Sequence, residues 1–106
     1  MSNLTDEQYL LAHALFKRQQ WSQAFLAYRP FADAGDPAAQ VVLGWMYCEG
    51  VGTAVDVAAG LRCFQAAANA GDVKGNFYCG RMAFKQGDYK QGLDEFRRAA
   101  DVAGYQ

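Results

Sequence analysis

The strongest constraint in this sequence is that it repeats itself. The tripeptide Ala-Gly-Asp at residues 34–36 returns at residues 70–72, which is 36 residues later. The same offset aligns the residue pairs at 43–44 and 79–80, each of which ends in glycine. A fixed period of about 30 to 45 residues is typical of a solenoid, in which small units stack to bury a shared core. The repeat therefore predicts an array of similar units along the chain.

Residue choice indicates that each unit is helical. The chain of 106 residues is rich in alanine, leucine, glutamine and arginine, and it contains no isoleucine and only two threonines. Strands are usually built from more β-branched residues than this. Hydrophobic residues make up 52% and charged residues 20% of the chain, which is the composition of a folded domain. Turn signals divide the sequence into six predicted helices: 5–19, 21–34, 37–48, 57–70, 73–86 and 89–103.

Aspartate residues mark where the later helices are expected to begin. Asp36 precedes Pro37, which matches an N-cap followed by proline at the first helical position. Asp56, Asp72 and Asp88 stand at the equivalent place before the next three predicted helices. We expect each of these carboxylates to accept a hydrogen bond from the first turn of its helix.

Small residues occupy one position in the first helix of each unit. Ala12, Gly44 and Gly80 align there when the units are superimposed. We expect the two helices of a unit to approach each other closely at this position. A larger side chain would force them apart and would cost stability through overpacking.

The last predicted helix has an apolar stripe along one side and charged residues around the other. The stripe comprises Tyr89, Leu93, Phe96, Ala100 and Ala103. We expect this stripe to be buried against the stack, so that the charged side faces water. That arrangement is typical of a terminal repeat that closes an array.

Residues 38–72 carry the motif that suggests a family. Its members are Leu43-Gly44, Tyr47, Gly50, Gly52, Asp56, Ala66-Ala67 and Gly71. This pattern resembles one complete Sel1-like repeat, and the flanking segments resemble tetratricopeptide repeats. The resemblance implies an all-α fold, a short right-handed α-solenoid of about three helix–turn–helix repeats. The whole chain, 1–106, would be one helical-repeat domain with units at about 5–35, 37–71 and 73–104.

The charge balance excludes some classes of partner. Ten basic and eleven acidic residues leave a net charge of −1, whereas a nucleic-acid-binding protein normally carries a basic excess. The sequence has no polybasic segment that would bind an anionic membrane surface. The amino-terminal segment has neither the basic start nor the apolar middle of a signal peptide. We therefore expect a cytoplasmic protein that contacts neither nucleic acid nor membrane.

The sequence contains no recognisable catalytic or metal-binding motif. His13 is the only histidine, so no site with several histidines is available. Cys48, Cys63 and Cys79 are spaced unlike any zinc motif, and reduced core thiols are the favoured interpretation. The glycines of segment 50–52 follow no strand and precede no lysine, so they indicate a turn and not a phosphate-binding loop. We expect no enzyme, no catalytic residue, no metal and no cofactor.

The first helix of each unit is expected to line a concave groove. Superimposing these helices at Ala12, Gly44 and Gly80 predicts which side chains face it. The candidate partner-binding residues are Tyr9, His13, Val41, Trp45, Phe77, Arg81, Lys74 and Lys85. Aromatic and arginine side chains dominate binding hot spots, and we expect Trp45 and Arg81 to be the most exposed. The alternative is that the aromatic rows pack between repeats.

The resemblance implies a non-enzymatic function in protein–protein interaction. An adaptor, an assembly scaffold or a partner of an effector or toxin would bind a peptide or helix in the groove. One alternative is a structural repeat module that associates with itself, for example as a homodimer. Another is a Sel1-like protein that binds or hydrolyses β-lactams. Such proteins carry paired cysteines within each repeat, a pattern that this sequence does not show.

Overall fold

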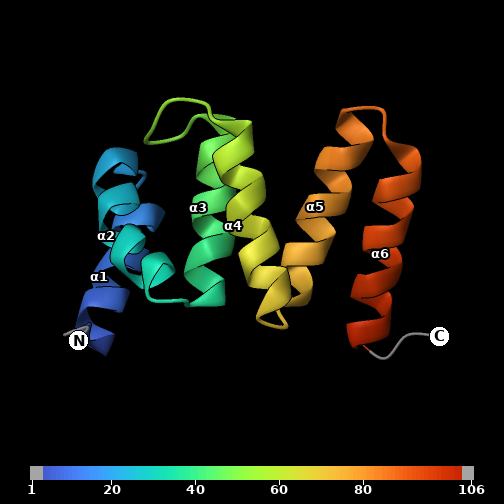
Figure 1. Cartoon of the computed structure of the whole chain (residues 1–106). Helices are drawn as coiled ribbons and strands as arrows, with labels where there is room; N and C mark the ends of the chain where they lie inside the picture. The colour runs from blue at the N-terminus through green and yellow to red at the C-terminus, as the bar shows by residue number, and fades with distance from the viewer. Residues whose placement is uncertain (1–3, 104–106) are drawn as a thin grey trace.

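The computed structural model contains six α-helices in a row (Figure 1). It describes residues 4–103, and for residues 102 and 103 it describes the backbone alone. The helices are α1 (Asp6–Lys17), α2 (Trp21–Asp33), α3 (Pro37–Glu49), α4 (Val57–Asn69), α5 (Val73–Lys85) and α6 (Tyr89–Ala103). No strand occurs in this part of the chain. The all-α prediction is confirmed, although the predicted end of the third unit, residue 104, lies outside the described residues.

Short polar side chains begin most of the helices. Thr5 caps α1, where its hydroxyl accepts a hydrogen bond from the backbone N–H of Gln8. The carboxylates of three aspartates accept equivalent bonds at the starts of α4, α5 and α6, as predicted. These residues are Asp56, Asp72 and Asp88. Asp36 is the N-cap of α3 and Pro37 follows it, as predicted, but the Asp36 side chain does not make the expected hydrogen bond to the first turn.

The helices pack in chain order. Each helix contacts the next one, and the first helices α3 and α5 also contact each other directly. One buried cluster joins α1, α2 and α3 around Tyr28 and Met46, which are 2% and 0% exposed. A second cluster joins α3, α4 and α5 around Phe64, which is 1% exposed. Because both clusters include residues of α3, the core continues from α1 to α5, as in a solenoid whose units bury each other's faces.

Two helix pairs approach each other through glycine. A Cβ atom on Gly44 of α3 would lie 2.5 Å from Cε1 of Phe64 and 3.0 Å from the carbonyl oxygen of Gly60, both on α4. The same geometry recurs in the last pair, where a Cβ on Gly80 would lie 2.6 Å from Cε1 of Phe96. These contacts leave no room for a side chain. The predicted close approach at residues 44 and 80 is confirmed.

The orientation of α6 differs from the prediction. Tyr89 and Leu93, expected to be buried in its apolar stripe, are 62% and 56% exposed. Glu95 is instead only 4% exposed and accepts hydrogen bonds from Asn76 at 3.2 Å and Arg98 at 3.0 Å. The reason is that Gly92 and Phe96 of α6 lie against Gly80 of α5. This contact fixes the rotation of α6 about its axis. The side chain of Ala103, also assigned to the stripe, lies outside the described part.

We predict that Gly44→Leu lowers the free energy of unfolding by about 1–3 kcal/mol, because the new side chain overlaps the ring of Phe64. Thermal unfolding followed by circular dichroism measures this change. Ala38→Leu is the matched control, because Ala38 is exposed on the same helix. Equal melting temperatures for the two variants would show that α3 and α4 do not pair at Gly44.

Candidate functional site

A small pocket lies between the first helices of the second and third units. We call it the α3–α5 pocket. Its lining residues are Trp45, Cys48, Glu49, Phe64, Tyr78, Arg81, Met82 and Lys85. Most of these side chains come from α3 and α5, and Phe64 reaches the pocket from α4. The pocket therefore depends on the contact between α3 and α5.

The floor of the α3–α5 pocket is aromatic and its rim is charged. The ring of Tyr78 stacks on that of Phe64, with centroids 4.9 Å apart and planes 13° apart. The guanidinium carbon of Arg81 lies 5.9 Å from the centroid of Tyr78, within the range of a cation–π interaction. Lys85 Nζ lies 3.8 Å from Oε1 of Glu49. Both of these side chains are about half exposed, so the ion pair contributes at most about 1 kcal/mol.

A second aromatic side chain of α5 lies open beside this rim. Phe77 is 46% exposed, and its ring contacts the rings of Tyr78 and Phe96 at centroid distances of 5.6 and 5.7 Å. Its position is thus fixed by packing, while nearly half of its surface faces solvent. Lys74, one turn earlier on α5, is exposed as well. An exposed ring held in place by neighbours loses little conformational entropy when it binds.

Two of the predicted groove residues are not exposed as expected. Val41 is 8% exposed and belongs to the buried cluster around Phe64, so it does not point into an open groove as expected. Trp45 is only partly exposed, because its ring packs near Phe16 and Trp21 at centroid distances of 5.8 and 6.3 Å. The indole joins the first unit to the second, and its edge lines the α3–α5 pocket.

The predicted residues of α1 lie apart from this pocket. The ring of Tyr9 packs edge-on against Tyr28 and Phe31, at centroid distances of 5.8 and 5.0 Å. Burial, with the nearby charge of Asp36, raises the pKa of the Tyr9 phenol. His13 is exposed, and its Nδ1 lies 3.4 Å from the hydroxyl of Tyr28. The structure thus gathers Trp45, Arg81 and Lys85 around one pocket but not Tyr9 and His13.

The predicted groove residues did not include five that line the pocket, namely Cys48, Glu49, Phe64, Tyr78 and Met82. Of these, Tyr78 contacts both Phe64 and Arg81. It corresponds to Val42 in the preceding unit, so the repeat gave no reason to single it out. Its place three residues before Arg81 was the available signal. Side chains three positions apart share one face of a helix and can meet there.

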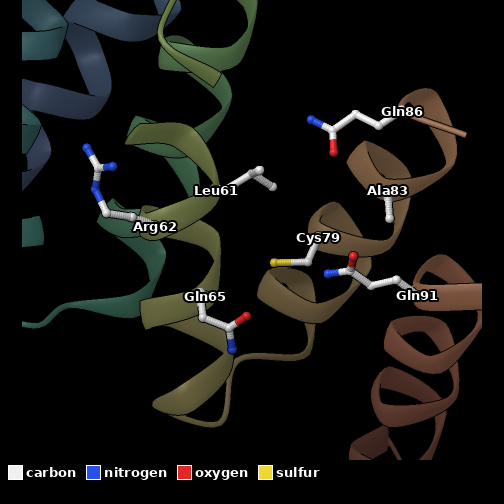
Figure 2. Close-up of a pocket in the computed structure, with 7 residues that line it drawn as sticks. All are labelled: Leu61, Arg62, Gln65, Cys79, Ala83, Gln86 and Gln91. Atoms are coloured by element: carbon white, nitrogen blue, oxygen red, sulfur yellow. The ribbon is translucent and has the colours of Figure 1, made fainter. Parts of the chain in front are cut away.

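A different hollow lies over α5, between the second helices α4 and α6 (Figure 2). Its volume is about 250 Å³, and it is lined by Leu61, Arg62, Gln65, Cys79, Ala83, Gln86 and Gln91. A similar hollow of about 260 Å³ lies between α2 and α4. The second helices α2, α4 and α6 are therefore separated from one another by these hollows, whereas the first helices α3 and α5 touch. We call the side of α3 and α5 on which the α3–α5 pocket lies the inner face, and the side with these hollows the outer side.

The hollow in Figure 2 contains a thiol, that of Cys79. The sulfur of Cys79 points from α5 toward α4, between Leu61 and Gln65 (Figure 2). Burial, together with the negative charge of Glu95, raises the pKa of this thiol to about 11. The thiol is therefore protonated at neutral pH. A protonated thiol is a weak nucleophile and a poor metal ligand. All three cysteines are free in the structure.

The packing of Trp45 predicts how two groove variants differ. Trp45→Ala should lower the free energy of unfolding by about 3 kcal/mol, the lower end of the range for removing a large buried aromatic, because the indole is half-buried. Arg81→Glu should lower it by less than about 1 kcal/mol, since Arg81 is exposed and loses only its contact with Tyr78. Urea unfolding measures both. A Trp45→Ala variant as stable as the wild type would contradict the observed indole packing.

None of the described helices combines the length and the apolar content that crossing a bilayer requires. A scan of the sequence against models of protein families gave no match, and a search of curated proteins also gave none.

Solved structures do resemble the chain. A Sel1 repeat protein from Oxalobacter formigenes matches 76% of this chain at 33% sequence identity, with a TM-score of 0.68. A protective antigen present in uropathogenic Escherichia coli strains, which displays an SLR fold, matches 89% of it at 31% identity, with a TM-score of 0.79. The chain spans only 35% and 22% of the lengths of these two proteins. With the motif at residues 38–72 and the glycine-paired helices, these likenesses show that the chain belongs to the Sel1-like repeat family.

Proposed function

We propose that this chain is a protein-interaction module that binds a segment of another protein on the inner face of α3 and α5. The observation that supports this best is the α3–α5 pocket, where an aromatic floor meets two cations, Arg81 and Lys85. The half-exposed ring of Phe77 lies on the same helix. Aromatic and arginine side chains that lie together in a pocket are the usual centre of a protein–protein interface.

The charges of α5 indicate the chemistry of the partner. Lys74, Arg81 and Lys85 follow at intervals of seven and four residues, so they lie along one side of the helix. The line they form is about 16 Å long, from the rise of 1.5 Å per residue. An acidic partner segment could pair with this line through charge-assisted hydrogen bonds. We therefore infer a partner segment that carries carboxylates together with at least one large apolar side chain.

The ion pair at the pocket leaves room for such a partner. Glu49 holds Lys85 at 3.8 Å, and both side chains are about half exposed. A carboxylate of the partner could take the place of Glu49 at little cost, because an exposed ion pair contributes at most about 1 kcal/mol. An apolar side chain would then contact Phe77 or the edge of Trp45. An adaptor or scaffold would use such a face to hold an extended segment or a helix.

The remaining candidates stand at a distance from this centre. Tyr9 and His13 lie on α1, two units away from Arg81 along the stack. In the proposed function they would contact only a partner long enough to cross α3. The α3–α5 pocket is thus the part of the groove that we expect to determine affinity.

A charge-reversal pair tests the proposed function. Wild-type chain would be used to capture a partner from lysate, and the affinity of the captured partner's binding segment would then be measured by fluorescence anisotropy. We expect Arg81→Glu/Lys85→Glu to weaken binding at least about tenfold, a loss of about 1.4 kcal/mol. Affinity for the wild type should also fall as salt is raised, because the contact is partly electrostatic.

The control reverses two charges on the outer side of the stack. Arg29→Glu/Arg62→Glu changes the net charge by the same amount, and both arginines are exposed on second helices beside the outer hollows. This variant should bind as the wild type does. Equal loss in both double variants would mean that net charge alone controls binding. Unchanged binding by Arg81→Glu/Lys85→Glu would contradict the proposal that the partner binds the α3–α5 face. Failure of the wild type to capture any partner would contradict it as well.

A further inference from the structure

A trough runs along the outer side of α5, between α4 and α6. The hollow in Figure 2 forms one half of it. A second hollow, of about 330 Å³, continues it toward the start of α5, and the two hollows share Gln65. The residues that line the second hollow are Gln65, Ala68, Asn69, Asn76, Arg98 and Asp101. We call the two hollows together the outer trough.

Side-chain amides line the outer trough on all three helices. They belong to Gln65 and Asn69 on α4, Asn76 on α5, Gln86 at the end of α5 and Gln91 on α6. Figure 2 shows the amides of Gln65, Gln86 and Gln91 around its half of the trough. Each amide has a carbonyl oxygen that accepts hydrogen bonds and an NH₂ group that donates them. The walls therefore present the same two kinds of group as a peptide main chain.

Several of these amide groups have no partner within residues 4–103. Asn76 is 7% exposed and donates from Nδ2 to Glu95 at 3.2 Å, but its Oδ1 atom accepts no hydrogen bond from a described residue. The side chain of Gln65 donates to Oδ1 of Asn69 at 3.1 Å, which leaves the oxygen of Gln65 and the NH₂ group of Asn69 free. Buried acceptors are normally paired. Asn76 thus favours a ligand that carries an N–H group.

The equivalent hollow one repeat earlier, between α2 and α4, shares part of this arrangement. Gln40, the counterpart of the buried asparagine on α5, lines that hollow, and its Oε1 atom is buried without a partner. The offset of 36 residues also places Gln65 at the position of Arg29, and Asn69 at that of Asp33. The unpaired amide oxygen therefore occurs in both hollows, but two charged side chains of the first are replaced by amides in the outer trough.

The charged residues of the outer trough balance one another. Arg62 lines the half shown in Figure 2, and Arg98 and Asp101 line the other half. Glu95 accepts a hydrogen bond from Arg98 at 3.0 Å below the second half. Two positive charges thus stand beside two negative ones. This balance favours a ligand without net charge, in contrast to the cationic α3–α5 pocket.

The floor and the length of the outer trough suit an extended chain. Leu61, Cys79 and Ala83 give its Figure 2 half an apolar lining, with the sulfur of Cys79 directed toward α4. From Asn76 to Gln86 the trough follows α5 for about 15 Å, at a rise of 1.5 Å per residue. About four to five residues of an extended chain have this length. Because alternate side chains of such a chain face opposite ways, one can lie on the floor while main-chain groups meet the walls.

We propose that the outer trough binds an extended polypeptide segment of another protein through its main chain. The amides of Gln65, Gln86 and Gln91 would pair with main-chain groups, and Oδ1 of Asn76 would accept from a main-chain N–H. An apolar side chain of the segment would lie against Cys79. Main-chain hydrogen bonds would provide the affinity, and the floor would select one apolar side chain. This inference does not rest on the proposed function, whose acidic partner binds the inner face.

Proton–nitrogen NMR with a neutral peptide tests this site. The probe is acetyl-Ser-Ala-Leu-Ala-Ser-amide, which carries no charge and has one large apolar side chain. It should bind the wild-type chain with a Kd of about 1 mM, equally in low and high salt because no ion pair forms. The side-chain NH₂ signals of Gln65, Gln86 and Gln91 should shift. Methylation of the backbone nitrogens of both alanines in the probe should abolish binding, because those donors are lost.

Two double variants locate the binding. Gln86→Ala/Gln91→Ala should weaken it at least about fivefold, because two walls of the trough lose their amides. Both glutamines are exposed, so circular dichroism should show the wild-type helix content. The matched control, Gln20→Ala/Gln23→Ala, removes two exposed glutamines at the start of α2 and should bind as the wild type does.

Absence of any shift at a probe concentration of about 10 mM would overturn the proposal. Equal binding of the methylated probe would also overturn it, because the main chain would then not be recognised. Equal weakening in the two double variants would show that the loss is not specific to the outer trough. Binding that is abolished by Arg81→Glu/Lys85→Glu and kept by Gln86→Ala/Gln91→Ala would place the probe on the inner face, against the proposal.

Discussion

The close approach of paired helices at glycine is the constraint on which the rest of this structure depends. Gly44 lets α3 lie directly against Phe64 of α4, and Gly80 does the same for α5 against Phe96 of α6. Because no side chain separates the backbones, the rotation of each helix about its axis is fixed by that contact. The side of α5 that bears Arg81 is thereby set toward the inner face, and Leu93 of α6 is set outward.

The sequence predicts the helices well because their signals are local. Thr5, Asp56, Asp72 and Asp88 begin helices by bonding to backbone groups within the next few residues, so no distant contact is needed. The pairing of helices could also be predicted, because small residues recur at Gly44 and at the equivalent positions, Ala12 and Gly80. Fold class and helix order therefore follow from short-range patterns and the repeat.

Exposure could not be predicted in the same way. Aligned residues occupy equivalent positions, but a residue in the middle of the stack has neighbours that a residue near its end lacks. Val41 and Phe77 align, yet Val41 is 8% exposed and Phe77 is 46% exposed. The indole of Trp45 is likewise covered by rings from the first unit, Phe16 and Trp21. The sequence places the candidate site on the first helices. Which of its residues are exposed depends on these neighbours, so that could not be predicted.

The same pairing geometry sets the inner face on which the α3–α5 pocket lies. Proton NMR of the α-protons of Gly44 and Gly80 tests that geometry most directly. Each glycine lies against an aromatic ring, so its α-protons should be shifted strongly upfield and should show cross-relaxation with the ring protons of Phe64 or Phe96. Ordinary glycine shifts without such cross-peaks would contradict the pairing, and with it the placement of the inner face.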